Sequence, residues 1–188
     1  MILIKKLVFN NMSCSSITLN GIGLGCKNSM GGLKVVYIIK EDDIDDITLT
    51  EGVITGITLK EGKKFKTYRF RKGTSQMSTT LTTDEAAGTL SFQTDLALQF
   101  TKMETAKRLE IMSLCVDSVK AIALDSNGVY HFLGYDFPVT ASSATANTGL
   151  EFGAFNGYNI TLTDNSKELP YIVEIDDISE LIDEAPVA

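Results

Sequence analysis

Short apolar or alternating runs, separated by glycine, asparagine and serine, make up most of the sequence, and this pattern is typical of β-strands joined by turns. The clearest run is 33–39, Leu-Lys-Val-Val-Tyr-Ile-Ile, which is β-branched and almost continuously apolar. It predicts a strand that is covered on both faces. Between the runs 119–124 and 129–133 lies Asn127-Gly128, the dipeptide that most strongly favours a hairpin turn. We therefore expect a mainly β fold.

One helix interrupts this pattern. Residues 102–116 carry apolar side chains at spacings of three and four, which predicts an amphipathic helix with these side chains on its buried face: Met103, Ala106, Leu109, Met112 and Val116. Thr101 is its candidate N-cap residue, and Glu104 lies at the offset that would complete a capping box. Further strands are expected at residues 2–9, 16–19, 47–59, 89–101, 158–163 and 169–175, and a small-residue loop at 141–148. Gly52 and Gly56 predict bends or bulges within 47–59.

The length and composition predict one domain. A chain of 188 residues, of which 44% are hydrophobic, is long enough to bury a single core. We expect a single β-rich domain at residues 1–175, an extended arm or hairpin at 60–88 within it, and an acidic C-terminal segment at 176–188 that is either a solvated tail or a short docking helix. The predicted architecture is a β-sandwich or half-barrel with one flanking α-helix and an extended β arm.

The charge and the absence of targeting signals exclude several classes of protein. The formal net charge of -7 argues against a surface built to bind nucleic-acid phosphates, which requires clustered Lys and Arg. The apolar run at the N-terminus is too short for a signal peptide, and no segment approaches the roughly 20 apolar residues of a membrane span. Cys14, Cys26 and Cys115 are an odd number without metal-binding spacing, so we expect reduced thiols of the usual buried kind.

No motif in the sequence indicates catalysis or a cofactor. The string Gly21-Ile22-Gly23-Leu24-Gly25 lacks the spacing and the following helix of a dinucleotide fingerprint, so we expect a loop. His131 is the single histidine and lies in a predicted strand, where packing is a simpler role than proton transfer. The acidic pairs at 42–46 and 176–177 lack the glycine and terminal glutamate of a calcium loop. We expect no enzyme activity, no cofactor and no metal.

A basic strand and an acidic loop form the most probable contact surface. In residues 63–72, bases alternate with Phe65, Tyr68 and Phe70, which suits either base stacking on nucleic acid or contact with an acidic partner. Because the chain is acidic overall, we favour contact between copies, in which the basic face of one subunit meets the acidic loop at 41–46 or the acidic C-terminal tail of another. The residues predicted at this subunit interface are Lys64, Lys66, Tyr68, Arg69, Arg71, Asp42, Asp43, Asp45 and Asp46.

The layout from residue 89 to residue 174 resembles the tail-tube and ring proteins of tailed bacteriophages. The shared features are the long strand 89–101, the helix 102–116, the hairpin at Asn127-Gly128, Gly134-Tyr135, Asn156-Gly157-Tyr158 leading into 160–163, and Leu169-Pro170-Tyr171. The N-terminal part, with Asn20-Gly21-Ile22, Cys26 and the run 31–37, is similar to structural proteins of phages that infect gut Bacteroidetes, including crAss-like phages.

This resemblance implies a virion structural protein of the tail that is assembled in the host cytoplasm. Such subunits form hexameric or dodecameric rings around a lumen, contact other tail or portal-proximal proteins, and let DNA pass without specific binding or contact with a membrane. The β arm, for which residues 64–83 are the candidate, would bridge to a neighbour because a lone hairpin has too little core to be stable. A long tail tube and a short-tail ring both remain open. The alternative is a non-catalytic binding module, such as an adhesin or a carbohydrate-binding sandwich.

Overall fold

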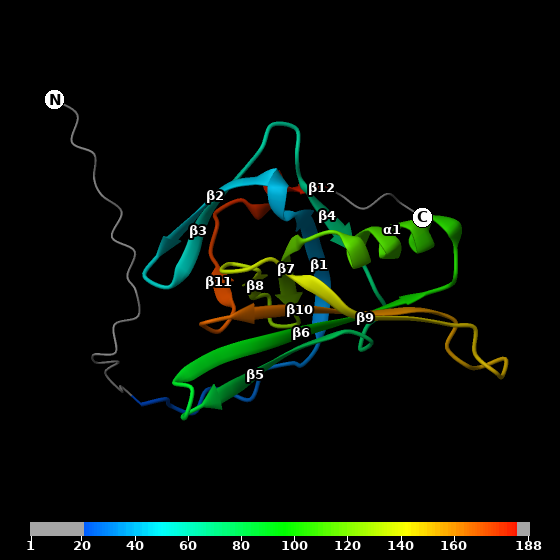
Figure 1. Ribbon diagram of the computed structural model, residues 1–188, viewed down its shortest axis with the longest axis horizontal. Helices are drawn as coiled ribbons and strands as arrows, with labels where there is room; N and C mark the ends of the chain where they lie inside the picture. Colours follow the sequence, from blue (N-terminus) through cyan, green and yellow to red (C-terminus); the bar gives the residue numbers. More distant parts are fainter. Residues whose placement is uncertain (1–20, 184–188) are drawn as a thin grey trace.

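Within residues 21–183, which the computed structural model describes, the chain folds into two β-sheets and one α-helix (Figure 1). The eight-stranded sheet A has the order β12-β4-β1-β7-β8-β11-β3-β2, and the four-stranded sheet B has the order β5-β6-β10-β9. Residues 1–20 and 184–188, with the strands expected at 2–9 and 16–19, lie outside the described residues.

The strands of each sheet are separated along the sequence. Sheet A contains β1 (Leu33–Lys40), β2 (Ile44–Thr50), β3 (Val53–Leu59), β4 (Phe65–Tyr68), β7 (Val119–Asp125), β8 (Tyr130–Leu133), β11 (Tyr171–Val173) and β12 (Ile182–Asp183). Sheet B contains β5 (Gln76–Asp84), β6 (Thr89–Thr101), β9 (Thr140–Asn147) and β10 (Gly157–Ser166). The helix α1 (Thr105–Val116) and the short 3₁₀ turns η1 (Glu41–Asp43) and η2 (Ile178–Leu181) complete the described elements.

Sheet A curls into a half-barrel and carries a buried cluster on each face. The first cluster lies between sheet A, sheet B and α1, and includes Val36, Ile38, Leu98, Leu114 and Ile160. The second cluster lies inside the curl and includes Ile39, Ile54, Phe65, Ile122 and Phe132. Successive side chains of a strand point to opposite faces, so β1 contributes to both clusters. The predicted mainly β fold, a sandwich or half-barrel with one flanking helix, is confirmed.

The strongest local signals in the sequence are confirmed by the pairing of the strands. Strand β1 is buried from both faces, and β7 and β8 form the hairpin predicted at Asn127-Gly128. Its turn is held by the Asp125 carboxylate, which accepts hydrogen bonds from the backbone N–H of Asn127 and of Val129, both at 2.8 Å. Gly52 lies in the turn between β2 and β3, with a φ of 84°, and a register shift of this pair lies opposite Gly56.

One segment expected to be a loop is a strand. Residues 140–147, Thr-Ala-Ser-Ser-Ala-Thr-Ala-Asn, form β9, which pairs along its length with β10. Small polar residues give little apolar contrast, so the sequence pattern did not reveal the strand, and the long neighbouring strand β10 supplies the pairing that fixes it. Backbone pairing has overridden a weak local preference here.

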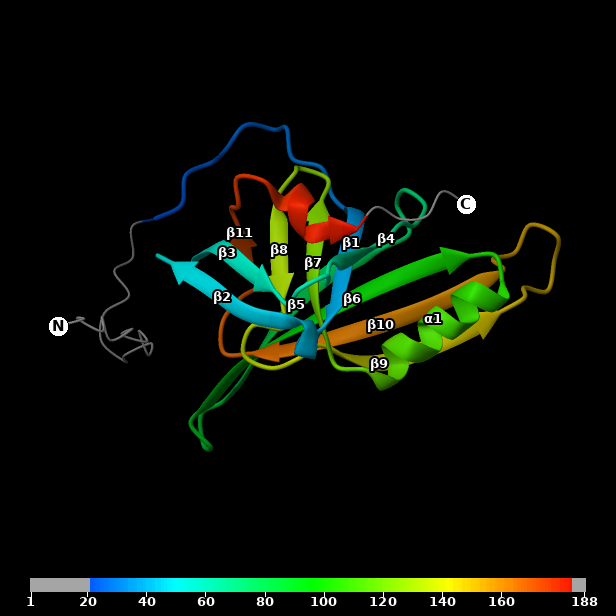
Figure 2. The same cartoon turned by 90° about the horizontal axis from the view of Figure 1, so that it is seen from above.

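The expected arm at residues 60–88 is divided between the two sheets. The basic strand is not an arm: β4 pairs with β1, and its Phe65 is completely buried in the second cluster. Burial of this large side chain explains why the segment folds onto its own body. The part that projects is instead the end of the β5–β6 hairpin, where residues 81–90 are all exposed (Figure 2).

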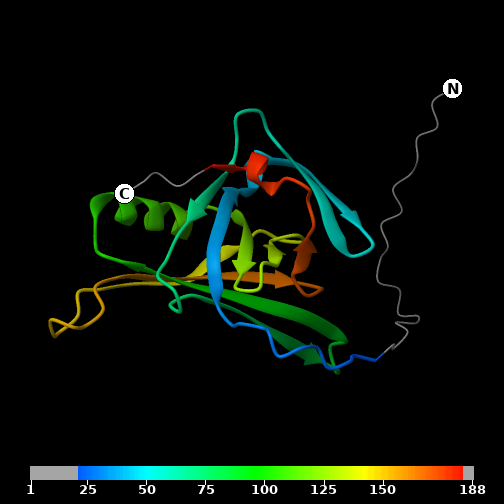
Figure 3. The same cartoon turned by 180° about the vertical axis from the view of Figure 1, so that it is seen from behind.

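The acidic C-terminal segment also packs on the domain as far as it is described. In residues 176–183, η2 is followed by β12, which pairs in parallel with β4. Ile178, Leu181 and Ile182 contact the second cluster. Of the two alternatives for this segment, a docked element is the one observed: Figure 3 shows η2 and β12, drawn in red, beside β4, and their apolar side chains contact the second cluster.

A buried carboxyl connects the two sheets. Asp164 of β10 is 2% exposed, and its Oδ2 accepts a 3.0 Å hydrogen bond from the backbone N–H of Gly134, at the end of β8. Its Oδ1 is buried without a hydrogen-bond partner in the described residues. Burial, with the negative charge of Asp136 adding to it, raises the pKa of Asp164, against the opposing effects of the Gly134 N–H and Lys120. The contribution of Asp164 to stability therefore depends on its protonation state.

The substitution Asp164→Asn tests this dependence. A carboxyl with a raised pKa in the folded chain favours folding while it is protonated, and it loses that contribution as the pH rises from its ordinary pKa of 3.8 through the folded value. Wild type should therefore lose unfolding free energy relative to Asp164→Asn over this window, by at most about 1.4 kcal/mol per pH unit. Urea denaturation of both proteins from pH 4 to 8 measures the difference.

The substitution Asp164→Leu is the contrasting control. It removes the acceptor and leaves the Gly134 N–H unpaired, so it should destabilise the protein at every pH, by about 1–3 kcal/mol. A constant difference in stability between wild type and Asp164→Asn across the whole range would contradict the assignment.

Candidate interaction surfaces

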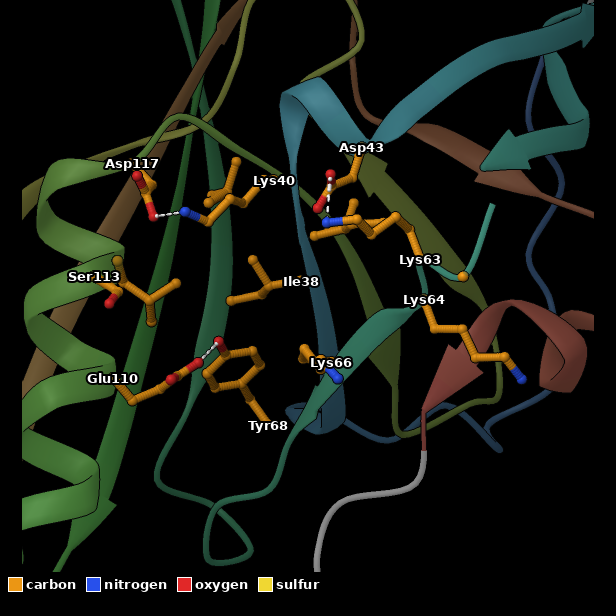
Figure 4. A pocket seen from close by; sticks show the side chains of 14 residues that line it. Ile38, Lys40, Asp43, Lys63, Lys64, Lys66, Tyr68, Glu110, Ser113 and Asp117 are labelled. Atoms are coloured by element: carbon orange, nitrogen blue, oxygen red, sulfur yellow. Dashed lines mark hydrogen bonds and ion pairs between the residues drawn. The ribbon is translucent and has the colours of Figure 1, made fainter. Parts of the chain in front are cut away.

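A cleft of about 300 Å³ lies between α1 and the adjoining strands β1 and β4 (Figure 4). Its floor is apolar, with Ile38, Leu114 and Val119. Its rim carries lysines and acids from both walls: Lys40, Lys63, Lys64, Lys66, Asp43, Glu110 and Asp117. We call it the lysine cleft, and it contains three of the basic and acidic residues predicted to form a subunit interface, Lys64, Lys66 and Asp43.

Most of the lysines in this cleft are already paired within the chain. The Nζ of Lys40 lies 2.6 Å from Oδ2 of Asp117, and that of Lys63 lies 3.1 Å from Oδ1 of Asp43. Asp183 of β12 pairs in the same way with Lys66, at 2.5 Å, and this lysine lowers the pKa of the Asp183 carboxyl. Compensated charges of this kind give the cleft little attraction for an anion.

Tyr68 connects the two walls of the lysine cleft. Its hydroxyl donates a hydrogen bond to Glu110 Oε1 of α1. Burial raises the pKa of the Tyr68 hydroxyl, and the bond to Glu110 and the charge of that carboxylate raise it further. The phenol therefore keeps its proton. Its position makes Tyr68 a contact between β4 and α1 within one chain; a role at a subunit interface stays a prediction.

The predicted acidic residues lie in different places. Asp43 in η1 faces Lys63, while Asp42 beside it is exposed. Asp45 and Asp46 are exposed on β2, which is an edge strand of sheet A. The complementarity expected between subunits is thus met in part within one chain, by Asp43 and Lys63. The predicted contacts of Asp42, Asp45 and Asp46 with a second copy stay predictions.

A second cleft, of about 270 Å³, contains the two arginines predicted at the interface. It is lined by Arg69, Phe70, Arg71, Phe100, Thr101 and Lys107, and we call it the cationic–aromatic cleft. No acidic side chain lines it, and among the described residues neither arginine forms an ion pair. It is therefore a positive site with aromatic walls on a chain that is acidic overall.

The helix exposes the face that was expected to be buried. Leu109, Met112 and Val116 are 57%, 52% and 79% exposed, whereas Ile111 and Leu114 enter the first cluster. The expected cap is also wrong, because Glu104 is the N-cap residue and no side chain caps the helix. The sequence contained two apolar stripes on one helix, and packing against the end of the sandwich selected the shorter one. Leu109, Met112 and Val116 form the exposed helix stripe.

A loop at the end of sheet B presents a second set of uncovered apolar side chains. Residues 148–156 join β9 to β10, and their Leu150 and Phe152 are 99% and 113% exposed. Figures 1 and 2 show this loop, drawn in yellow and orange, at the end of sheet B opposite to the tip of the β5–β6 hairpin. We call it the apolar loop.

The single histidine lies beside a carboxylate that holds a turn. His131 of β8 is half-buried, and its Nε2 lies 3.6 Å from Oδ2 of Asp125, the carboxylate that holds the β7–β8 turn. No described Ser or Cys hydroxyl or thiol is hydrogen-bonded to it, so no nucleophile is paired with this base. Cys26 and Cys115 are free and exposed, contrary to the burial that was expected.

Two further searches of residues 21–183 were negative. No group of three or more His, Cys, Asp or Glu side chains is arranged to hold a metal ion. No helix in this part of the chain is long and apolar enough to cross a membrane.

Comparison of the chain with protein-family models, with curated protein sequences and with solved structures finds no match in any of the three.

The sequence reasoning missed the apolar loop and the exposed helix stripe. Residues 150–155 resemble the start of a strand, although the flanking Gly149 and Gly153 are a turn signal that weighs against one. For the helix, Ile111 and Leu114 form only a short apolar stripe at a spacing of three, and periodicity favours the longer stripe, which packing did not bury. The aromatic wall of the second cleft, Phe70 and Phe100, comes from segments that only the fold brings together.

Paired substitutions in α1 test which stripe is buried. Leu114→Ala should lower the unfolding free energy by about 2–5 kcal/mol, because it creates a cavity in the first cluster. Leu109→Ala, in an exposed side chain of the same type on the same helix, should change it by less than about 0.5 kcal/mol. Urea denaturation at low protein concentration measures both. A larger loss from Leu109→Ala would contradict the described orientation of α1.

Proposed function

We propose that this protein is a virion structural protein, a tail-tube or ring subunit that self-assembles into part of the DNA conduit of a tailed bacteriophage. The observation that carries the proposal is the β5–β6 hairpin. Residues 81–90 are exposed throughout, and Leu81 and Leu90 are about half exposed. A two-stranded ribbon without a core of its own is marginally stable in water, so a second surface is needed to order it. A neighbouring subunit supplies such a surface.

Uncovered apolar side chains elsewhere also favour an assembly. They occur in the apolar loop, in the exposed helix stripe and in the extended segment before β1, where Ile22 and Leu24 are 101% and 106% exposed. Burying one large apolar side chain contributes about 1.5–3 kcal/mol of favourable free energy, so a partner that covers these residues is bound more tightly. Uncovered apolar patches on several sides are unusual for a protein that acts alone.

The two edge strands of sheet B carry little charge. Strand β9 has no charged residue and β5 has only Asp84, and both are edge strands. Proteins that remain monomeric usually protect their edge strands with charges, prolines or bulges. The β5 edge has little protection and supports self-association through the sheet, whereas α1 packs beside the β9 edge.

The basic strand β4 already has a neighbouring strand within its own chain. The basic strand was expected to need a neighbour, but β4 is paired within sheet A and two of the nearby lysines have acidic partners in the same chain. The support for self-association comes instead from the hairpin, the apolar loop and the β5 edge. The assignment to a phage tail rests on the resemblance in the order of sequence features.

The alternative, a non-catalytic binding module, has less support. A carbohydrate-binding platform needs exposed aromatic side chains, usually Trp or Tyr. The chain has no Trp, and each of its Tyr residues is half-buried or buried: Tyr37, Tyr68, Tyr130, Tyr135, Tyr158 and Tyr171.

Shortening the hairpin tests the proposal. Replacing residues 82–91 by Asn-Gly closes the β5–β6 ladder immediately after the pair Leu81↔Phe92 and leaves the two cores intact. The purified wild-type protein should form rings in negative-stain electron microscopy and a large species in sedimentation velocity. The shortened variant should fold with an unchanged melting temperature within a few degrees and sediment as a monomer or a small oligomer.

The matched control is Thr82→Ser with Thr83→Ser, which keeps the length and polarity of the hairpin. A wild-type protein that stays monomeric at high concentration, alone and with other virion proteins, would overturn the proposed function. Rings that form equally well from the shortened variant would show that the hairpin is not an assembly element.

A further inference from the structure

We infer that the apolar loop of one copy docks into the cationic–aromatic cleft of a second copy, with Leu150 and Phe152 against its aromatic wall and Glu151 against its arginines. This contact rests on the proposed self-assembly and specifies which surfaces of the subunit meet. It also assigns a partner to two predicted interface residues, Arg69 and Arg71.

The tip of the apolar loop carries one acidic and two large apolar side chains in succession, Leu150-Glu151-Phe152. Both apolar side chains are fully exposed, and nothing in residues 21–183 covers them. Interfaces are usually centred on a few large side chains of this kind, which insert into a pocket and lose all contact with water. Placing an acid between two such anchors specifies a pocket that is both apolar and positive.

The base of the loop is rigid, so the tip is held away from its own body. Asn156 Oδ1 accepts a hydrogen bond of 3.3 Å from the backbone N–H of Met103. The backbone oxygen of Asn156 accepts a second hydrogen bond, of 2.8 Å, from the backbone N–H of Lys102. Gly157 lies so close to β6 that a Cβ atom at this position would be 2.1 Å from the backbone oxygen of Phe100, so only glycine fits here. A turn bond of 3.0 Å from Ala154 N–H to Glu151 oxygen shapes the tip itself. Holding the tip in place reduces the entropy lost on binding.

The cationic–aromatic cleft has the complementary chemistry. Phe70 and Phe100 supply an apolar wall that continues into the first cluster. Arg69 and Arg71 are exposed and have no acidic partner among the described residues, whereas Lys107 already pairs with Glu104 at 3.2 Å. An arginine can bind a carboxylate through two parallel hydrogen bonds and can also stack on an aromatic ring.

The walls of this cleft are also fixed. The turn after β4 is closed by Thr74, whose hydroxyl donates to the backbone oxygen of Arg71 at 2.7 Å. The buried Ser75 then accepts from the backbone N–H of Gln99 at 3.2 Å, which holds the turn against β6. Both partners of the contact are therefore formed before they meet, as is common in specific interfaces.

The loop does not fill the cleft of its own chain, because Leu150 and Phe152 are exposed to solvent to their full extent. The contact therefore joins two different surfaces on two copies. In a ring this contact is heterologous and repeats from one copy to the next until the rotation closes; made reciprocally between two copies, it gives a twofold dimer.

An exchange of charges between tip and cleft tests the contact. Glu151→Arg and Arg71→Glu should each weaken self-association by about 10-fold or more in sedimentation velocity, since each places like charges together. The double variant Glu151→Arg with Arg71→Glu should recover most of the wild-type affinity, because it restores an opposite pair in reversed order. Phe152→Ser should weaken association by about 30-fold or more.

The matched control is Leu169→Ser, a leucine that is 59% exposed and lies outside every surface proposed for assembly. It should leave association within about 3-fold of wild type. The isolated subunits of all variants should keep the wild-type melting temperature, because the substituted side chains are exposed.

Each outcome separates this contact from the proposed function. Association that is insensitive to Phe152→Ser and to both charge reversals would overturn the contact while the proposed assembly stands. Loss of association in the single variants without recovery in the double variant would also overturn it, since the tip would then bind elsewhere. If Arg71→Glu abolished binding of a single-stranded oligonucleotide and left self-association unchanged, the cleft would be a nucleic-acid site. A wild-type protein that is monomeric throughout would remove the proposed function itself.

Discussion

The fold depends on the burial of sheet A from both faces. Strand β1 contributes Val36 and Ile38 to the cluster against sheet B, and Ile39 to the cluster inside the curl. Because both clusters share this wall, the position of sheet B, the curl of the half-barrel and the docking of the C-terminal residues are linked through one set of strands. Asp164 and Gly134 add a polar connection at the same boundary.

This arrangement leaves the ends of sheet B free of core packing. The β5–β6 hairpin extends beyond one end, and the apolar loop extends beyond the other (Figure 2). Between them, the two edges of the sheet carry almost no charge. A subunit with projections at opposite ends and an open edge at β5 is suited to repeated contacts with copies of itself, and these features support the proposed ring more directly than net charge does.

The basic strand illustrates how a correct pattern can lead to a wrong interpretation. Alternating bases and aromatics in residues 64–71 indicated a ribbon that reached for a partner. Phe65 is instead buried in the half-barrel. Two lysines form ion pairs with acidic residues elsewhere in the chain, Lys63 with Asp43 and Lys66 with Asp183. Pairing over more than a hundred residues, as in the second of these, leaves no local sequence signal.

The sequence by itself determined the elements whose signals are local. Strand β1 follows from a continuous β-branched run, the β7–β8 hairpin from Asn127-Gly128, and the existence of α1 from its periodicity, because each depends on interactions between near neighbours. Only the tertiary structure decided that β9 is a strand, that α1 buries Ile111 and Leu114, and that Phe70 and Phe100 line one cleft. Each of these features depends on which distant segment packs against the residues concerned. The free energy of that packing exceeds their weak local preferences for secondary structure.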